Sequence, residues 1–155
     1  MLAAQALYET LRDDSEATVG IRALLGNTTA TPYNVHHAFL PEAIDFSAAG
    51  GTKAFIVYQF ISGTPDNTSH NRAALLSQEV YSVTVYARSL AKIIAVHKRV
   101  KLLLHDKRSV TDPSSGVVIF RMALDAQNPP RFDDAFETWF QSAFYRAWVR
   151  DDNLS

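Results

Sequence analysis

The chain has 155 residues, of which 47% are hydrophobic, and a formal net charge of −1. This composition can fill an ordinary core and is not that of a disordered tail, and the charge gives no general attraction to nucleic acid or to an anionic membrane. There is no cysteine, which excludes disulfides and thiolate metal sites and favours assembly inside a cell. We expect residues 1–155 to form a single domain with no signal peptide and no transmembrane segment.

The first third of the chain predicts two short helices and one extended segment. Residues 2–13 repeat apolar side chains at helical spacing, and residues 15–26 predict a second helical turn that ends at a glycine. A short extended segment is expected at residues 33–39. Residues 40–52, with a pair of glycines, are expected to form a loop.

A strand and a long polar segment follow. Residues 53–61 are apolar on both faces, which is typical of a strand in the middle of a sheet. Residues 62–77 are rich in polar residues and predict an exposed loop between two neighbouring strands, of a length that is usually mobile or functional. The loop residues that we consider candidates for contacts with a partner are Asp66, Asn67, His70 and Arg72.

Residues 78–106 are the most informative part of the sequence, because a strand pattern passes directly into a helix pattern. Tyr81, Val83 and Val85 alternate with polar residues, as in a strand with one buried face. From Ser89, a plausible helix N-cap, the period becomes that of an amphipathic helix over residues 89–106. This helix must dock on the sheet, because an isolated helix of that length is not stable in water.

The last third predicts two strands, at residues 117–124 and 136–149, separated by turns. The final strand has large aromatic side chains on both faces. One face is therefore expected to pack on the helices and the other against a neighbouring subunit, with Trp139 and Tyr145 as candidate contacts. The predicted fold class is α+β: a mostly antiparallel β-sheet with helices on one face and one helix crossover, residues 89–106.

The charged and histidine residues do not form a recognisable catalytic or metal site. His36 and His37 would point to opposite faces of a strand, and no zinc-binding or metalloprotease spacing is present. Ser69 and His70 leave a small hydrolase as one hypothesis, although the nucleophile-elbow motif is missing. We expect no catalytic residue, no metal and no cofactor.

The strongest charge feature is the basic run on the predicted helix. Lys98, Arg99 and Lys101 form either a solvated helix face or a contact with an acidic partner, and the acidic residues near 13–16 and 133–137 make the same protein one such partner. The run lacks the aromatic stacking groups of a nucleic-acid site, so we expect no sequence-specific binding of nucleic acid.

Taken together, these segments resemble a tailed-phage tail terminator, also called a tail completion or head–tail joining protein, over about residues 2–150. The resemblance is carried by the initial helix ALYETLRDD, the strand FIVYQFISG, the strand YSVTVYAR that passes directly into the helix SLAKIIAVHKRVKLLLHD, and the closing strands VVIFRMAL and the segment from Phe136. Leu24-Leu25-Gly26 and the Pro32-Tyr33 step fit the same pattern.

The resemblance implies a homohexameric ring of a siphovirus-like or myovirus-like virion. Such a ring caps the tail tube, stops its polymerisation and joins the tail to the head connector. Its partners would be itself, the tail tube protein and a connector or stopper protein, with the genome free to pass through the ring. It would be assembled in the host cytoplasm and lie at the head-proximal end of the tail. The alternatives are another connector ring, such as a stopper or neck protein, and a small non-enzymatic binding module that uses the loop 62–77.

Overall fold

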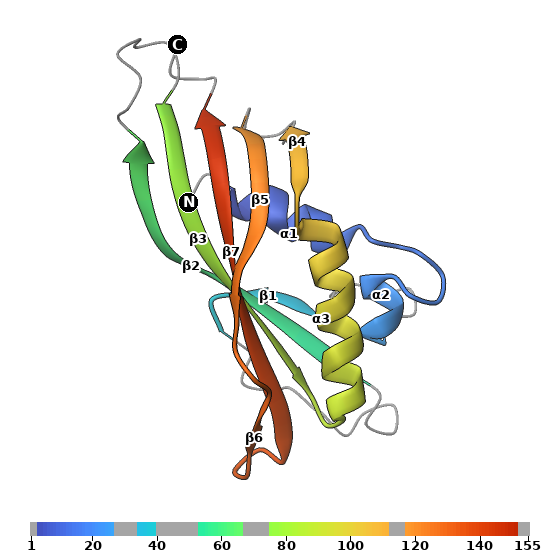
Figure 1. The fold of residues 1–155 in the computed structure, drawn as a ribbon. Helices are drawn as coiled ribbons and strands as arrows, with labels where there is room; N and C mark the ends of the chain where they lie inside the picture. The colour runs from blue at the N-terminus through green and yellow to red at the C-terminus, as the bar shows by residue number, and fades with distance from the viewer. Residues whose placement is uncertain (1–2, 27–33, 40–52, 67–74, 112–116, 152–155) are drawn as a thin grey trace.

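The computed structural model describes residues 3–26, 34–39, 53–111 except 67–74, and 117–151 (Figure 1). The described elements are α1 (Ala4–Arg12), α2 (Ile21–Leu24), β1 (Val35–His37), β2 (Ala54–Asp66), β3 (Leu75–Ala87), α3 (Leu90–Leu104), β4 (Lys107–Thr111), β5 (Val117–Gln127), β6 (Arg131–Asp133) and β7 (Thr138–Asp151). The loop predicted for residues 40–52 lies outside the described residues.

The strands form one sheet in the order β1-β2-β3-β7-β5-β4, and β6 pairs with β7 to one side of this path. All the described pairs are antiparallel except β1 with β2, which is parallel. Helix α3 leaves the end of β3 and returns the chain at β4, so it crosses over β7 and β5. The predicted α+β class and the helix crossover are therefore confirmed.

The strand-to-helix unit forms as its two periodicities predict. Ser89 is extended, with φ −110°, and its side chain accepts a hydrogen bond from the backbone N–H of Lys92 at 3.4 Å, which caps α3. The alternating residues Tyr81 and Val83 of β3 and the helix residues Ile93 and Val96 are all fully buried in the same core. The apolar stripe of α3 thus docks on one face of the sheet.

The three helices lie on that same face (Figure 1). The odd-numbered residues of β7 point toward them: Ala143, Tyr145 and Val149 are at most 1% exposed. Leu7 and Leu11 of α1 belong to the same core cluster and are equally buried. A fully buried leucine or valine side chain contributes about 1.5–3 kcal/mol through the hydrophobic effect, so this layer stabilises the otherwise marginal short helices.

The prediction of a loop over residues 62–77 is wrong at both of its ends. Residues 62–66 continue β2 and residues 75–77 begin β3, in register from Ser62 opposite Val80 to Asp66 opposite Leu76. The polar composition and Gly63 suggested a loop, but backbone pairing needs no apolar side chains. Here the paired ends of β2 and β3 extend past the helices (Figure 1).

The sequence analysis did not predict two short strands. β4 had no predicted structure, and β6 lies inside a segment that we expected to be a turn at 125–135. Both are short, and each pairs in the described sheet with one neighbour, β4 with β5 and β6 with β7. Such short edge strands carry little periodicity, and β6 follows two prolines. The final strand accordingly begins at Thr138 and not at Phe136, because residues 134–137 form the turn between β6 and β7.

Candidate interaction surfaces

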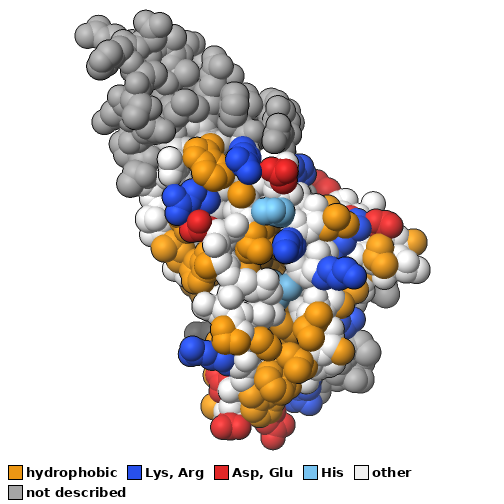
Figure 2. Space-filling view, viewed as in Figure 1, with side chains coloured by type: hydrophobic (Ala, Val, Ile, Leu, Met, Phe, Trp, Pro, Cys, Tyr) orange, Lys and Arg blue, Asp and Glu red, His pale blue; other side chains and the backbone are white. Residues whose placement is uncertain are grey.

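The outer surface of α3 carries apolar and cationic side chains together. Ile94 and Leu102 are 56% and 70% exposed, and Lys98 and Lys101 are exposed beside them. In the space-filling view, basic, histidine and hydrophobic side chains gather over this part of the molecule (Figure 2). An exposed apolar patch with a polar rim marks a candidate site for binding another protein.

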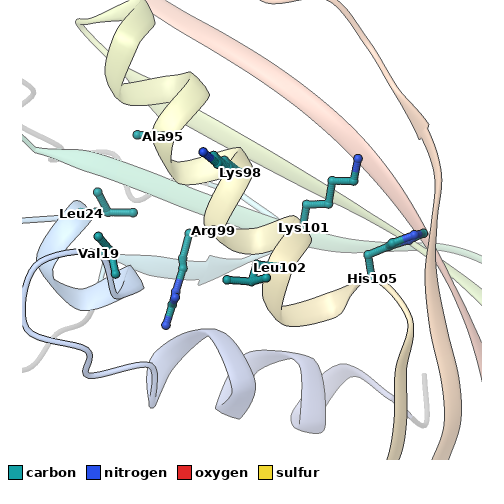
Figure 3. Close-up of a pocket in the computed structure, with 8 residues that line it drawn as sticks. All are labelled: Val19, Leu24, Ala95, Lys98, Arg99, Lys101, Leu102 and His105. Atoms are coloured by element: carbon teal, nitrogen blue, oxygen red, sulfur yellow. The ribbon is translucent and has the colours of Figure 1, made fainter.

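A groove of about 540 Å³ runs between α3 and the segment that leads into α2 (Figure 3). We call it the α2–α3 groove, and its lining residues are Val19, Leu24, Ala95, Lys98, Arg99, Lys101, Leu102 and His105. Val19 and Leu24 come from the α2 side, and the others come from α3 or, for His105, from its C-terminal cap. The groove therefore combines an apolar floor with a cationic rim.

Arg99 does not belong to the free cationic rim, because acidic residues of the same chain hold it. Its Nε and Nη2 donate to the two carboxylate oxygens of Asp14 at 2.8 and 2.7 Å, and Nη2 also lies 2.6 Å from Oε2 of Glu16. Asp14 accepts a further hydrogen bond from the backbone N–H of Ile21 at 2.7 Å. The hydrogen bonds from Arg99 hold the pKa of the Asp14 carboxyl below its usual value.

This network changes the interpretation of Arg99, which the sequence analysis considered a candidate contact residue. Arg99 is used inside the subunit, so we withdraw it as a contact residue. The suggestion that the acidic residues near 13–16 pair with the basic run holds for Arg99. Lys98 and Lys101 make no ion pair with a described residue. They remain the candidates on α3.

The turn that presents Val19 to the groove is fixed by a close backbone approach. The N–H of Gly20 donates to the carbonyl of Glu16 at 3.0 Å. A Cβ added at Gly20 would lie 2.5 Å from that carbonyl oxygen and 2.6 Å from the Glu16 nitrogen. Only glycine fits here without a shift of the backbone, so the wall of the groove depends on a glycine at this position.

A second hollow, of about 380 Å³, lies between α3 and the sheet and includes the buried His97. The His97 Nε2 is 2.8 Å from the carbonyl oxygen of Gln141, which requires Nε2 to be the protonated nitrogen. Its Nδ1 has no hydrogen-bond partner among the described residues. Burial lowers the pKa of His97, so the neutral ring is the form that the fold accepts.

The end of β6 and the turn that leads into β7, residues 133–137, form a second apolar and charged feature that we call the acidic tip. Phe136 is 69% exposed at its centre, and Asp134 and Glu137 beside it are exposed. The backbone is held locally, because Asp133 accepts from the N–H of Ala135 at 2.9 Å and Thr138 donates to the carbonyl of Phe136 at 2.7 Å. The sequence analysis named the acidic residues at 133–137 as a possible partner of the basic run, but it did not predict the turn that exposes Phe136 among them.

The two aromatic candidates of β7 have different positions. Trp139 is half-buried and packs edge-to-face on Phe132 at 5.2 Å, so it supports the base of the acidic tip. Tyr145 is 1% exposed within the core, and we withdraw it as a contact residue because no other subunit can reach it. Of the loop candidates, Asp66 ends β2, and its side chain and the residues Asn67, His70 and Arg72 lie outside what the structure describes.

The sheet face turned away from the helices carries the even-numbered residues of β7. Phe140 stacks on Tyr86 at 6.1 Å, and the ring of Trp148 lies under Arg121 at 5.6 Å. Phe144 and Arg146 lie between them and are half-buried. The prediction that one aromatic face packs on the helices is thus resolved: the face with Tyr145 does, and the face with Phe140 does not.

Among the described residues, no group of three or more histidine or acidic side chains is placed to hold a metal ion. None of the described helices is long and apolar enough to cross a membrane.

Comparison with known proteins gives one informative result. No protein-family model and no curated protein matches the chain. Among solved structures, the chain is similar to a chain in the virion of a native gene transfer agent (GTA) particle, with a TM-score of 0.58 and 18% sequence identity. The similarity covers 95% of this chain and 94% of the other. At that identity, the similarity shows a shared fold over nearly the whole length of both chains.

Proposed function

We propose that the protein is a structural component of a phage-like virion, and more specifically a tail terminator that forms a ring on the tail tube. The observation that carries the proposal is the similarity of fold, over 95% of the chain, to a chain of a gene transfer agent virion. The resemblance of the strand–helix unit at residues 78–106 to tail terminators supports the specific role.

The surface chemistry supports an assembly role. An isolated subunit exposes Leu102 and Phe136 at 70% and 69%, on two separate features. Apolar and aromatic side chains at these positions are available to be buried in the core of an interface. We propose accordingly that the protein acts by binding and not by catalysis. The partners proposed are itself, the tail tube protein and a head connector or stopper protein, at the head-proximal end of the tail.

The test is reconstitution with the tail tube protein of the same particle. Light scattering should give the mass of a closed ring of six subunits, and substoichiometric addition to polymerising tube protein should shorten the tubes. Electron microscopy should then show extra sixfold density at one tube end. A protein that stays monomeric or dimeric and leaves tube length unchanged contradicts the terminator role.

The same experiment separates the alternative connector role. A ring that binds the head connector but leaves tube growth unaffected is a stopper or neck protein, for which the similarity to a virion chain would hold equally. Esterase and phosphatase assays on the same preparation should show no activity above buffer, whereas reproducible turnover would favour the hydrolase hypothesis.

A further inference from the structure

We propose that the acidic tip of one subunit docks into the α2–α3 groove of a second copy of the same chain. This inference deepens the proposed function, on which it rests, because it states which surfaces join neighbouring subunits of the ring. It follows from three observations: the complementary chemistry of the two features, their separation on one subunit and their preformed geometry.

The chemistry of the two features is complementary. The acidic tip presents the exposed ring of Phe136 between the carboxylates of Asp134 and Glu137. The groove offers an apolar floor that includes Val19 and Leu102, which are 45% and 70% exposed. An aromatic side chain that enters a groove and carries flanking charges to a rim of opposite sign is a common form of interface anchor.

The cations on the rim are available for this contact. Lys98 and Lys101 are exposed and make no ion pair with a described residue. Arg99, by contrast, is occupied by Asp14 and Glu16. The groove therefore keeps two cations that pair with no described residue beside its apolar floor, and the acidic tip supplies carboxylates without disturbing the internal ion pairs.

The two features are too far apart on one subunit to meet. The acidic tip lies at the far end of the β6–β7 arm, beyond the N-terminal end of α3, whereas the groove lies along the middle and C-terminal part of that helix (Figures 1 and 3). The contact must therefore form between copies. Because it joins two different patches, it is heterologous, so each subunit gives one tip and receives another. Repetition of such a contact forms a ring when the rotation between neighbours closes, which is what the proposed function requires.

Both features are held by contacts within the subunit before they bind. Asp133 and Thr138 fix the turn of the acidic tip through their hydrogen bonds to Ala135 and Phe136. The groove wall is fixed by the Gly20 turn and by the Arg99–Asp14 ion pair. Preformed surfaces lose little conformational entropy on association, which favours a specific contact between them.

The decisive experiment uses two variants that each damage one patch. Phe136→Ser removes the aromatic anchor of the tip, and Leu102→Glu places a carboxylate in the groove. Both positions are highly exposed, so circular dichroism should show an unchanged fold. Each variant alone should associate at least about tenfold more weakly than the wild type in analytical ultracentrifugation. Phe39→Ser, at a side chain that is 76% exposed elsewhere, is the matched control and should keep the wild-type mass.

Mixing the two variants tests the direction of the contact. In an equimolar mixture, the intact tip of the Leu102→Glu subunit can enter the intact groove of the Phe136→Ser subunit, and no further subunit can add. The mixture should therefore give dimers and no rings. A mixture that stays monomeric, or a variant that alone keeps the wild-type mass, overturns the docking of tip into groove.

A cross-link provides an independent readout, because the natural chain has no cysteine. A Phe136→Cys, Leu102→Cys double variant should oxidise to a covalent ladder that ends at the ring size, whereas a Phe39→Cys, Leu102→Cys variant should not. If Phe136→Ser forms normal rings but no longer binds tube protein, the tip contacts the tube, and the inference fails while the proposed function stands. A wild-type protein that never forms rings, even with tube protein, instead contradicts the proposed function itself.

Discussion

Replacing Arg99 by methionine should destabilise the protein much more than the same change at Lys98, its neighbour on α3. Arg99 makes two charge-assisted hydrogen bonds to Asp14, whose side chain is 8% exposed, and the side chain of Arg99 itself is 14% exposed. Without the guanidinium, the Asp14 carboxylate stays largely buried with a hydrogen bond from Ile21 as its main remaining partner. Methionine keeps the helix propensity and most of the side-chain volume, so the change isolates the ion pair.

The expected loss is about 3 kcal/mol of unfolding free energy. Hydrogen bonds to charged groups contribute about 1.5–3 kcal/mol each, and breaking a buried ion pair from one side costs about 3–5 kcal/mol. We take the lower end because Glu16, the other partner of Arg99, is 56% exposed. For a domain of this size, such a loss lowers the melting temperature by roughly 6–12 °C. Lys98→Met should change the unfolding free energy by no more than about 0.5 kcal/mol.

Urea unfolding followed by circular dichroism measures this difference directly. A double-mutant cycle with Asp14→Asn should give a coupling energy of about 2 kcal/mol, because the two side chains contact each other. The reasoning is refuted if Arg99→Met costs no more than Lys98→Met, or if the two changes at 14 and 99 are additive. In that case the ion pair would be a surface contact that contributes negligibly to the free energy of unfolding.

Two further predictions concern the core. Burial lowers the folded-state pKa of His97 below the ordinary value of about 6.5, so the unfolded chain binds the proton first and unfolding free energy should decrease as the pH falls from about 7 to 5. This decrease in unfolding free energy, measured by urea midpoints, should be smaller in His97→Gln. An equal pH dependence in the variant and the wild type would contradict the role given to His97. Tyr145→Ala should lower the free energy of unfolding by about 3–5 kcal/mol, whereas Phe144→Ala on the other face of β7 should lower it by about 1–2 kcal/mol. Equal losses, followed by circular dichroism, would mean that both faces belong to the core.

The parts of the fold that the sequence predicts are those with a strong period. The alternation of Tyr81, Val83 and Val85 and the helical stripe through Ile93 and Val96 each report a single buried face, and both lie in the core. The extended ends of β2 and β3 were missed because they carry no such period. Their pairing is set by the register of the hairpin, in which Ser62 faces Val80, and not by burial.

The candidate contacts could be predicted only in part, because pairing partners are distant in the chain. Arg99 and Lys98 are equivalent in the sequence pattern, yet one is held by Asp14, 85 residues away, and the other is exposed. Adjacent residues on a helix point about 100° apart, so only the position of the segment before α2 decides which cation is used inside the subunit. The acidic residues at 133–137 were recognised only as charges for a related reason: they form a surface feature with Phe136 only when β6 pairs with β7.

The two faces of β7 show why aromatic content alone cannot decide which side is core. The face with Phe140, Phe144 and Trp148 is the more aromatic, but it lies away from the helices and stays half-buried. The buried face instead alternates Tyr145 with the small residues Ala143 and Ala147, which leave room for α3 to approach the sheet closely. The informative signal is therefore the run of small residues on one face, since a helix can dock only where the sheet leaves volume for its own apolar side chains.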